Sequence, residues 1–240
     1  MYVTEAGYEI IAPSPLIGEG RRQLYRTIEL AGRTCYKSED KITDDSAAAF
    51  VASIVKMGHE AMLEHASVSV RFTMDRGLSH EIVRHRMAAF AQESTRWCNY
   101  SKGKFGNGCT FVLPRDAVLD EQTRKQGGDA EIAAQNVHKI LKEWCVACKD
   151  AEEHYMRLLE MGASPEIARG VLPNALKTDI VVTANLREWR HIFKMRAVTT
   201  YGRPHPQMKQ LMHDLLADFA KAMPEVFADI LENEAEEEKS

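Results

Sequence analysis

The chain has 240 residues and 45% hydrophobic content, which is enough for a sizeable core and most economically forms one domain. Its net charge of −4 argues against a protein that depends on non-specific contact with nucleic acid. The N-terminus lacks a signal pattern, no long apolar run occurs, and the five cysteines form no disulfide framework, so the sequence predicts a cytoplasmic protein outside the membrane.

Helix and strand signals alternate in the first part of the chain. Period-two alternation of apolar residues predicts half-buried strands, and three-to-four spacing predicts helices. Thr43 or Asp44 is the expected cap of the second helix, and Gly77 separates the second strand from the third helix. The predicted strands are residues 2–12 and 68–74, and the predicted helices are residues 18–35, 46–58 and 78–87.

The remaining chain is mainly helical in pattern. A long amphipathic helix is predicted to end at Gly162, and Ser164 followed by Pro165 is typical of the start of another. Asn185 is expected to cap the helix after the third strand. That strand is predicted over residues 179–184, and the helices over 129–161, 186–196 and two segments after Pro206 and Pro224.

These elements predict a mixed α/β protein of the α+β type, in which helices pack on a mostly antiparallel sheet. No internal repeat or linker divides the chain, so residues 1–230 are expected to form a single catalytic domain. The acidic run in residues 231–240 is expected to be a solvated tail.

Several short motifs resemble metal or nucleotide sites but lack a required residue. HEIVRH and HEAMLEH are similar to the zinc protease signature, but Arg84 and Leu63 stand where the second histidine is needed. Cys145 and Cys148 form one CxxC inside a predicted helix, and structural zinc needs four ligands, so these thiols are expected to pack in the core. No glycine-rich phosphate loop is present, and no metal site is predicted.

The segment RHRMAAFAQESTRW begins with three adjacent cationic or titratable side chains. If this part of the chain is helical, Glu81, Arg84 and His85 share one face. Arg86 would then point about 200° away from Arg84, because the helix has 3.6 residues per turn. The three neighbours would therefore serve different ligands, or different parts of one ligand.

Further hydrogen-bond donors follow this motif. An extended backbone would direct Gln92, Ser94 and Arg96 the same way, and a hydroxyl beside a guanidinium suits a phosphate. Spacing alone fits a solvated surface with scattered ion pairs equally well. Further donors of this kind recur later in the chain, namely Arg169, Asn185, Arg187, His191 and Arg196. Their recurrence predicts a site for at least two anionic ligands.

Taken together, these segments resemble one protein family. Arg84-His85-Arg86, followed after seven residues by Ser94, is similar to the signature of the flavin-dependent thymidylate synthases. HEAMLEH precedes the motif at the interval seen in that family. GRTCYKSED, IARGVLPN, ANLREWRHIFKMR and PHPQM also resemble family segments in the same order, so the likeness covers roughly residues 30–210.

The resemblance implies an enzyme that converts dUMP to dTMP. The methylene would come from methylenetetrahydrofolate, and the reducing hydride from NADPH through FAD. It also implies a cytoplasmic homotetramer with active sites shared between subunits, and no nucleic-acid or membrane partner.

Family positions carry over to individual residues. Those that match FAD-binding positions are His59, Ala61, Glu64, Arg84, His85, Arg86, Gln92, Asn185, Leu186, Arg187 and His191. Those that match dUMP-binding positions are Glu81, Ile82, Val83, Arg84, Gln92, Glu93, Ser94, Thr95, Arg96, Arg169 and Arg196.

Two residues are the catalytic candidates, Arg196 and Ser94. Arg196 matches the arginine that activates the uracil ring; a guanidinium stays protonated, so it can stabilise developing negative charge but cannot act as a base. None of the cysteines has an evident activating histidine, so thiol addition to the ring is not expected. Ser94 is either a nucleophile or, as the lack of an evident His–Asp pair favours, a positioning residue.

The chain departs from the family pattern at four positions. Ala61 stands where some members present a hydroxyl to FAD, and Glu81 replaces a glutamine. Ala89 and Trp97 replace a serine and a tyrosine seen in many members.

Two other functions compete with this interpretation. A different flavoenzyme could use the same arginine-rich pocket on another nucleotide. A binding module could hold single-stranded nucleic acid through Arg84, Arg86, Arg96 and Trp97 by charge and stacking, although the negative net charge argues against it.

Overall fold

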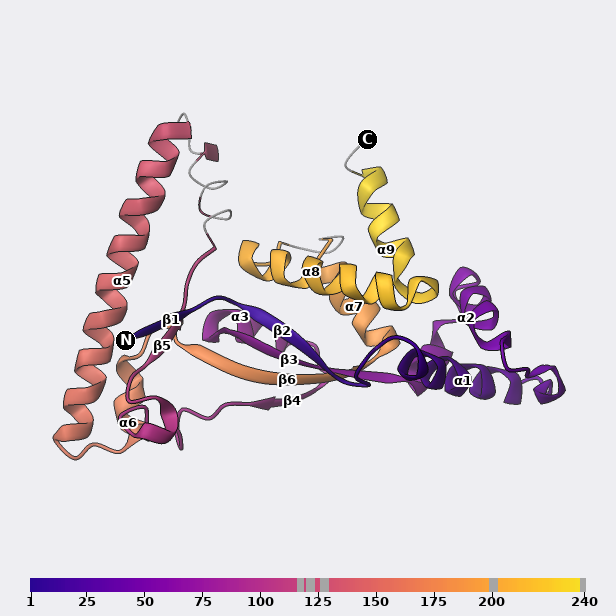
Figure 1. The fold of residues 1–240 in the computed structure, drawn as a ribbon, viewed down its shortest axis with the longest axis horizontal. Coiled ribbons are helices and arrows are strands. Elements are labelled where there is room, and N and C mark those ends of the chain that lie inside the picture. Colours follow the sequence, from indigo (N-terminus) through magenta and orange to yellow (C-terminus); the bar gives the residue numbers. More distant parts are fainter. Residues whose placement is uncertain (116–118, 120–123, 126–129, 199–202, 238–240) are drawn as a thin grey trace. The chain divides into compact units, whose positions relative to one another are not determined.

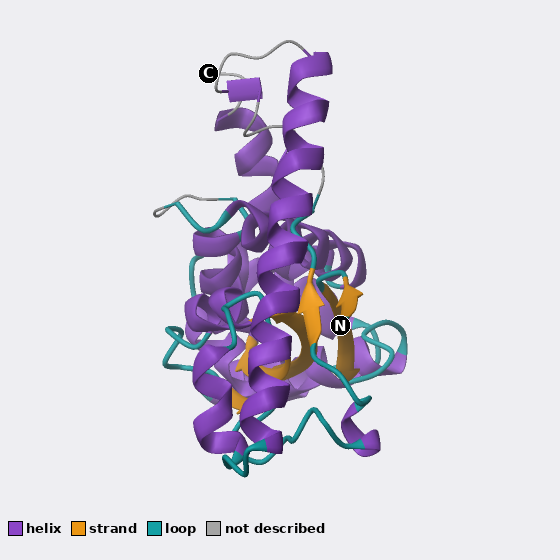
Figure 2. Cartoon of the chain, turned by 90° about the vertical axis from the view of Figure 1, so that its left-hand side faces the viewer, coloured by secondary structure: helices purple, strands orange, loops and turns teal. Residues whose placement is uncertain are grey.

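The computed structural model describes residues 1–115, 119, 124–125, 130–198 and 203–237. Helices are the main secondary structure of these residues (Figure 2). The strands are fewer, and β3 and β6 are the longest of them, with nine residues each. The chain divides into two compact units. Unit 1 is Met1–Gly7, Thr73–Ile82 and Ala91–Ile180, and unit 2 is Tyr8–Phe72, Val83–Phe90 and Val181–Ser240.

Two sheets are present in the described residues. The larger has the strand order β2-β3-β6-β4, and the smaller pairs β1 with β5 in parallel (Figure 1). Alternate residues of β3 are buried, as the period-two pattern predicted, and the predicted strand over residues 179–184 is confirmed as part of β6, whose alternate residues are also buried. The predicted α+β class with a mostly antiparallel sheet is confirmed. The strands are β1 (Tyr2–Thr4), β2 (Gly7–Ala12), β3 (Ser67–Asp75), β4 (Ala89–Gln92), β5 (Thr110–Val112) and β6 (Lys177–Asn185).

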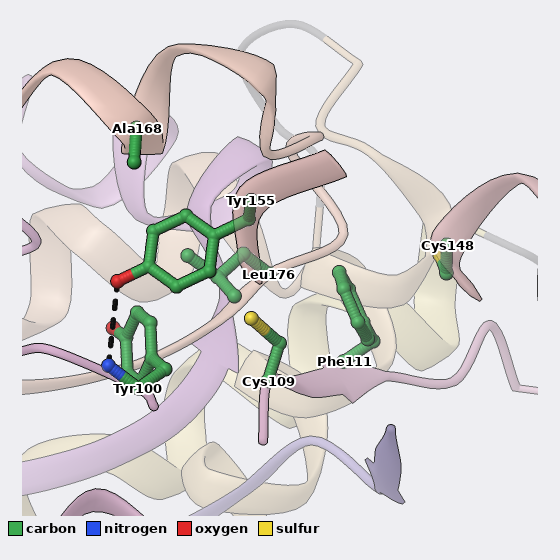
Figure 3. Packing of buried hydrophobic residues seen from close by; sticks show 7 residues of the cluster. All are labelled: Tyr100, Cys109, Phe111, Cys148, Tyr155, Ala168 and Leu176. Atoms are coloured by element: carbon green, nitrogen blue, oxygen red, sulfur yellow. Dashed lines mark hydrogen bonds between the residues drawn. The ribbon is translucent and has the colours of Figure 1, made fainter. Parts of the chain in front are cut away.

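Unit 1 is built around one long helix. The predicted helix over 129–161 is confirmed from Ala130 onward, residue 129 being outside the described residues, and it packs against α6 and η4. Its core includes Tyr100, Phe111, Tyr155 and Cys148, so the prediction for that cysteine is confirmed (Figure 3). The same prediction is wrong for Cys145, which is only partly buried and lies outside this core. The helices are α3 (Arg76–Ile82), α5 (Ala130–Glu160) and α6 (Pro165–Ala168), with 3₁₀ turns η3 (Gly103–Phe105) and η4 (Arg169–Val171).

Unit 2 contains the other helices. Its core is a cluster of aromatic rings from α7, α8 and α9, namely Trp189, Phe193, Phe219 and Phe227, with neighbouring ring centroids 5.2–5.7 Å apart. The helices are α1 (Glu19–Thr34), α2 (Ser46–Lys56), α7 (Leu186–Arg196), α8 (Pro206–Ala222) and α9 (Pro224–Glu237), with 3₁₀ turns η1 (Glu39–Lys41) and η2 (Glu60–His65).

The helix ends test the predicted caps. Asn185 caps α7 as predicted, because its side-chain oxygen accepts a hydrogen bond from the Glu188 amide at 2.8 Å. The cap predicted for α2 is wrong: Asp45 precedes the helix, and the Ser46 hydroxyl instead accepts from the Thr43 amide at 2.9 Å.

The acidic end of the chain is helical as far as it is described. Helix α9 continues through Glu237, and residues 238–240 lie outside the described residues. A single domain over residues 1–230 stays a prediction. Among the described helices, none combines the length and apolar content needed to cross a bilayer.

Candidate functional site

The arginine motif lies in a turn rather than in a helix. Helix α3 ends at Ile82, and the Ala88 amide donates to the His85 carbonyl at 3.1 Å to close a turn. The predicted helix through residue 87 is therefore wrong, and so is the shared helical face of Glu81, Arg84 and His85. Tertiary contacts of the buried His85 side chain override the local helical pattern here.

His85 joins a carboxylate to a guanidinium within unit 2. The Nε of Arg196 donates to Nε2 of His85 at 3.2 Å. On the other side of the ring, Nδ1 of His85 lies 3.5 Å from Oε1 of Glu188. An imidazole that accepts at Nε2 must carry its proton on Nδ1, so the hydrogen bonding assigns a neutral ring whose N–H faces Glu188. The ring thereby fixes the direction of the Arg196 side chain.

The electrostatics of this group keep the imidazole neutral. Burial and the positive charge of Arg196, together with nearby His191, lower the pKa of His85 to about 4. Burial also raises the pKa of Glu188, although nearby His191 lowers it. Burial and the permanent charge of Arg196 therefore decide the state of the ring.

A polar cavity of about 450 Å³ opens beside this group in unit 2. Arg187 donates to Glu64 at 2.5 Å, and Arg190 donates to Glu60 at 2.9 Å, so both guanidinium groups are held by carboxylates. The lining of this cavity therefore includes three cationic side chains (two arginines and Lys194) and three carboxylates. The lining residues are Glu60, Glu64, Met87, Asn185, Arg187, Glu188, Arg190, His191 and Lys194.

A second hollow of unit 2, of about 560 Å³, has a more apolar lining. His59 and Ala61, predicted to bind the same ligand as Glu64, line this hollow instead of the polar one. Its other walls come from α1, α2 and the segments after them, namely Gly32, Cys35, Tyr36, Ser38, Phe50, Ile54, Met57 and Met62.

One group of unit 2 has the composition of a metal site. His85, Glu188 and His191 offer ligand atoms within 4.8 Å of one another. Two imidazoles and a carboxylate form a known iron-binding set. However, the guanidinium hydrogen-bonded to His85 places a permanent positive charge beside the group, which opposes a second cation. We assign no metal to it.

The second part of the motif forms a turn in unit 1. Strand β4 ends at Gln92, and the amides of Trp97 and Cys98 donate to the Ser94 carbonyl at 3.2 and 2.9 Å. The predicted extended backbone through Arg96 is therefore wrong, because the chain bends at Ser94 and no longer alternates. We call residues 94–97 the serine turn.

Ion pairs and hydrogen bonds hold the serine turn in place. Nη1 of Arg169 donates to the Thr95 hydroxyl at 2.9 Å, and Nε of Arg96 lies 2.9 Å from Oε1 of Glu166. The Arg96–Glu166 pair is half-exposed, so an anionic ligand can compete for the guanidinium.

Gln92 lies inside unit 1 with its amide engaged. Its Nε2 donates to the hydroxyls of Ser79 and Thr178 at 2.9 and 3.2 Å, and Ser79 in turn donates to the Arg76 carbonyl. Nη1 of Arg76 is buried and has no hydrogen-bond partner among the described residues. An unsatisfied buried guanidinium nitrogen is unfavourable, and Arg76 is such a group.

The predicted residues thus fall into groups. Unit 2 brings together His85 and Arg196, and the cavity beside them is lined by Glu64, Asn185, Arg187 and His191, the last of which also contacts the His85 ring. Arg84 and Arg86 are exposed, whereas Ile82 and Leu186 are fully buried. Unit 1 contains Glu81, Ile82, Gln92, Glu93, Ser94, Thr95, Arg96 and Arg169.

Several residues of these sites were missed by the sequence analysis. Glu188 could have been found from the capping-box pattern, in which a glutamate follows the capping residue, here Asn185, by three positions. Glu60 lies within HEAMLEH but has no spacing signal of its own. Lys194 lies within ANLREWRHIFKMR but was not singled out there, and Arg76 and Lys177 are marked by no motif.

Comparisons of structure place the fold. The crystal structure of the UMP/dUMP methylase PolB from Streptomyces cacaoi, bound with 5-Br dUMP, superposes with a TM-score of 0.74 over 95% of this chain and 96% of that chain, at 21% identity. The same methylase bound with 5-Br UMP gives a TM-score of 0.73 at 20% identity. The chain therefore has the fold of a nucleotide methylase.

Comparisons of sequence identify the family. The family model described as thymidylate synthase complementing protein matches residues 22–225. The flavin-dependent thymidylate synthase of Corynebacterium aurimucosum is 33% identical over 216 residues, which cover 89% of this chain and 82% of the relative. Those of Geobacter sulfurreducens and Mycobacterium tuberculosis are 31% and 34% identical over 84% of this chain, covering 80% and 78% of the relatives. The chain belongs to the flavin-dependent thymidylate synthase family.

Proposed function

We propose that this protein methylates dUMP to dTMP, with methylenetetrahydrofolate as the one-carbon donor and NADPH as the source of the hydride carried by FAD. The observation that carries this proposal is the family match over residues 22–225, which includes Arg84-His85-Arg86, Ser94 and Arg196. The homotetramer with shared active sites and the cytoplasmic location are part of the same proposal.

The polar cavity of unit 2 fits a flavin dinucleotide by its chemistry. Such a ligand carries a diphosphate and several hydroxyl groups, which require cationic donors and carboxylate acceptors. Arg187 and Lys194 supply the donors, and Glu60 and Glu64 supply the acceptors. When bound, FAD would supply the hydride, and Asn185 and His191 would help to orient it.

The role of Arg196 follows from its side-chain chemistry. Its guanidinium is permanently charged and is oriented by the neutral His85 ring. We propose that it stabilises the negative charge that develops on the pyrimidine ring, as a preorganised donor does in an oxyanion hole. His85 would then act through Arg196, as a positioning residue.

The residues around the serine turn are proposed to bind the nucleotide. Ser94, Arg96 and Arg169 would hold the phosphate by a hydroxyl and two guanidinium groups. Ser94 is proposed to position the ligand, because its contacts in the described residues are made by its backbone carbonyl and include no base that could activate the hydroxyl.

Spectroscopy and product analysis test this function directly. The purified protein should show flavin absorption that NADPH bleaches in the presence of dUMP. It should also form dTMP and release tritium from C5-labelled dUMP only when methylenetetrahydrofolate is added. A parallel assay with UMP in place of dUMP distinguishes this activity from that of a ribonucleotide methylase, which would methylate UMP. A colourless protein that neither bleaches nor forms product, even when FAD is added, would refute the proposal.

A further inference from the structure

Three charged side chains of unit 1 form a partly buried cluster next to the serine turn. Nζ of Lys177 lies 3.0 Å from Oε2 of Glu93 and 2.5 Å from Oδ2 of Asp179. The second oxygen of each carboxylate is also engaged: the Tyr100 hydroxyl donates to Oε1 of Glu93, and the Thr73 hydroxyl donates to Oδ1 of Asp179, both at 2.7 Å. All these oxygens therefore have donors, which is the condition for a stable partly buried charge cluster. We call Glu93, Lys177 and Asp179 the triad.

The triad is attached to the serine turn through the backbone. Glu93 directly precedes Ser94, and the Glu93 amide donates to the Asp179 carbonyl of β6 at 2.9 Å. Both the main chain and the side chain of Glu93 are thus fastened to β6. On the other side of the turn, Arg169 donates to Thr95. The position of Ser94 is consequently set from both ends.

Tyr100 links the triad to the core of unit 1. Its ring is buried among Phe105 and Tyr155, and its amide donates to the Tyr155 hydroxyl at 3.3 Å (Figure 3). Burial and the hydrogen bond to Glu93 raise the pKa of Tyr100, so its hydroxyl remains a donor at any physiological pH. A rigid aromatic core therefore fixes one oxygen of Glu93.

The charge balance of the triad is the reason that Lys177 matters for an anionic ligand. Burial alone would lower the pKa of Lys177, but its hydrogen bonds to Asp179 and Glu93 and their charges outweigh burial and raise it. The side chain of Lys177 is 23% exposed and that of Glu93 is 19% exposed, so solvent screens their charges only in part. Without the ammonium, two carboxylates beside the serine turn would lack their counter-charge.

We propose that Lys177 is a positioning residue for nucleotide binding, which holds the serine turn through Glu93 and cancels the negative charge that would otherwise repel a nucleotide phosphate. This inference rests on the proposed function, because it assumes that the serine turn binds dUMP. It assigns a role to Lys177, Asp179 and Tyr100, none of which matched a family position in the sequence.

The test compares substitutions of Lys177 with a matched surface control. Lys177→Met keeps the aliphatic stem and removes the charge, and should raise the Kd for dUMP about tenfold, as expected for loss of a hydrogen-bonded charge. Lys177→Arg keeps the charge and should restore the Kd to within about threefold of the unsubstituted protein. Lys149→Met, on the exposed face of α5, is the control and should leave the Kd unchanged.

The steady-state kinetics separate positioning from general damage to the fold. Lys177→Met should raise the KM for dUMP while kcat at saturating dUMP changes by less than about twofold, because only binding is affected. Unchanged dUMP affinity in Lys177→Met would overturn the inference. The inference would also be overturned if Lys177→Arg lost as much dUMP affinity as Lys177→Met. A fall in the kcat and Tm of Lys177→Met with an unchanged KM for dUMP would overturn it too.

A second substitution decides the matter if Lys177→Met does not fold. Tyr100→Phe fills the same space and removes only the donor to Glu93, and should raise the Kd for dUMP about threefold. An unchanged Kd in that variant would also overturn the inference. Absence of dUMP binding by the unsubstituted protein would instead refute the proposed function, whereas normal binding with an unaffected Lys177→Met variant would refute the inference alone.

Discussion

Protonation of His85 should destabilise the protein at acidic pH. The side chain of His85 is 3% exposed, and burial together with Arg196 lowers its pKa from 6.5 to about 4. Below about pH 6.5 the unfolded chain binds a proton at this ring, whereas the folded chain does not do so until about pH 4. The stability contributed by the neutral ring is therefore complete above pH 6.5 and is lost as the pH falls through this interval.

The size of the effect follows from the same two values. Each pKa unit corresponds to about 1.4 kcal/mol, so the interval contributes about 3 kcal/mol to the pH dependence of the free energy of unfolding. Protonation would also place an N–H of His85 against the N–H of Arg196, which replaces the 3.2 Å hydrogen bond with repulsion. Loss of the arginine's orientation should accompany the loss of stability.

Urea unfolding and NMR titration measure this prediction in the flavin-free protein. The unfolding free energy of the unsubstituted protein should fall between pH 7 and pH 4 by about 3 kcal/mol more than that of His85→Gln, which cannot protonate there. His154→Gln, on the exposed face of α5, controls for loss of an imidazole. An imidazole resonance of His85 that titrates at or above pH 6.5 would refute the reasoning.

Three further predictions concern other charged or hydroxyl groups. Arg196→Ala should lower turnover by about 10²–10³, the effect of removing one preorganised donor, and full turnover at saturating substrates would exclude that role. Ser94→Ala should weaken dUMP binding and leave measurable methylation; complete loss of methylation with normal binding would indicate a nucleophile instead. Arg190 is buried against Glu60 and Asp229 and donates to the Val226 carbonyl, so Arg190→Ala should lower the free energy of unfolding by about 3 kcal/mol in urea titrations. A change below about 0.5 kcal/mol, typical of a surface substitution, would contradict it.

Local patterns were sufficient for most helices and for β3 and β6, but they merged β1 and β2 into one strand and did not indicate β4 or β5. The alternation through β3 and β6 and the long apolar stripe of α5 are set by burial on one face, which the sequence records directly. Asn185 was a correct cap prediction, because capping involves residues only three positions apart. The end of α3 was not predictable in this way: His85 leaves the helical pattern to meet Arg196, which is 111 residues away in the chain.

The candidate sites could be predicted only in part for the same reason. Family resemblance points to Ser94, Arg96 and Arg169 but gives no indication that Thr95 accepts a hydrogen bond from Arg169. The Lys177–Glu93 pair joins positions separated by 84 residues, and the family resemblance marks Glu93 but not Lys177. Such pairs depend on the order of the strands in the sheet and on where a turn begins. The periodic pattern of apolar residues in the sequence carries no information about either.

Arg196 and Lys177 are both cations whose direction is set by neighbouring hydrogen-bond acceptors. Neither guanidinium nor lysine ammonium has a lone pair while it is charged, so neither can be fixed by accepting a hydrogen bond. Arg196 is instead fixed by an acceptor whose own proton faces Glu188, and Lys177 by two carboxylates that Tyr100 and Thr73 hold. For Arg196, the orienting residue, His85, belongs to the signature motif itself. For Lys177, the orienting carboxylates are Glu93, which directly precedes Ser94, and Asp179, which matched no family position. A motif thus specifies which donors are present, and the surrounding acceptors determine where those donors point.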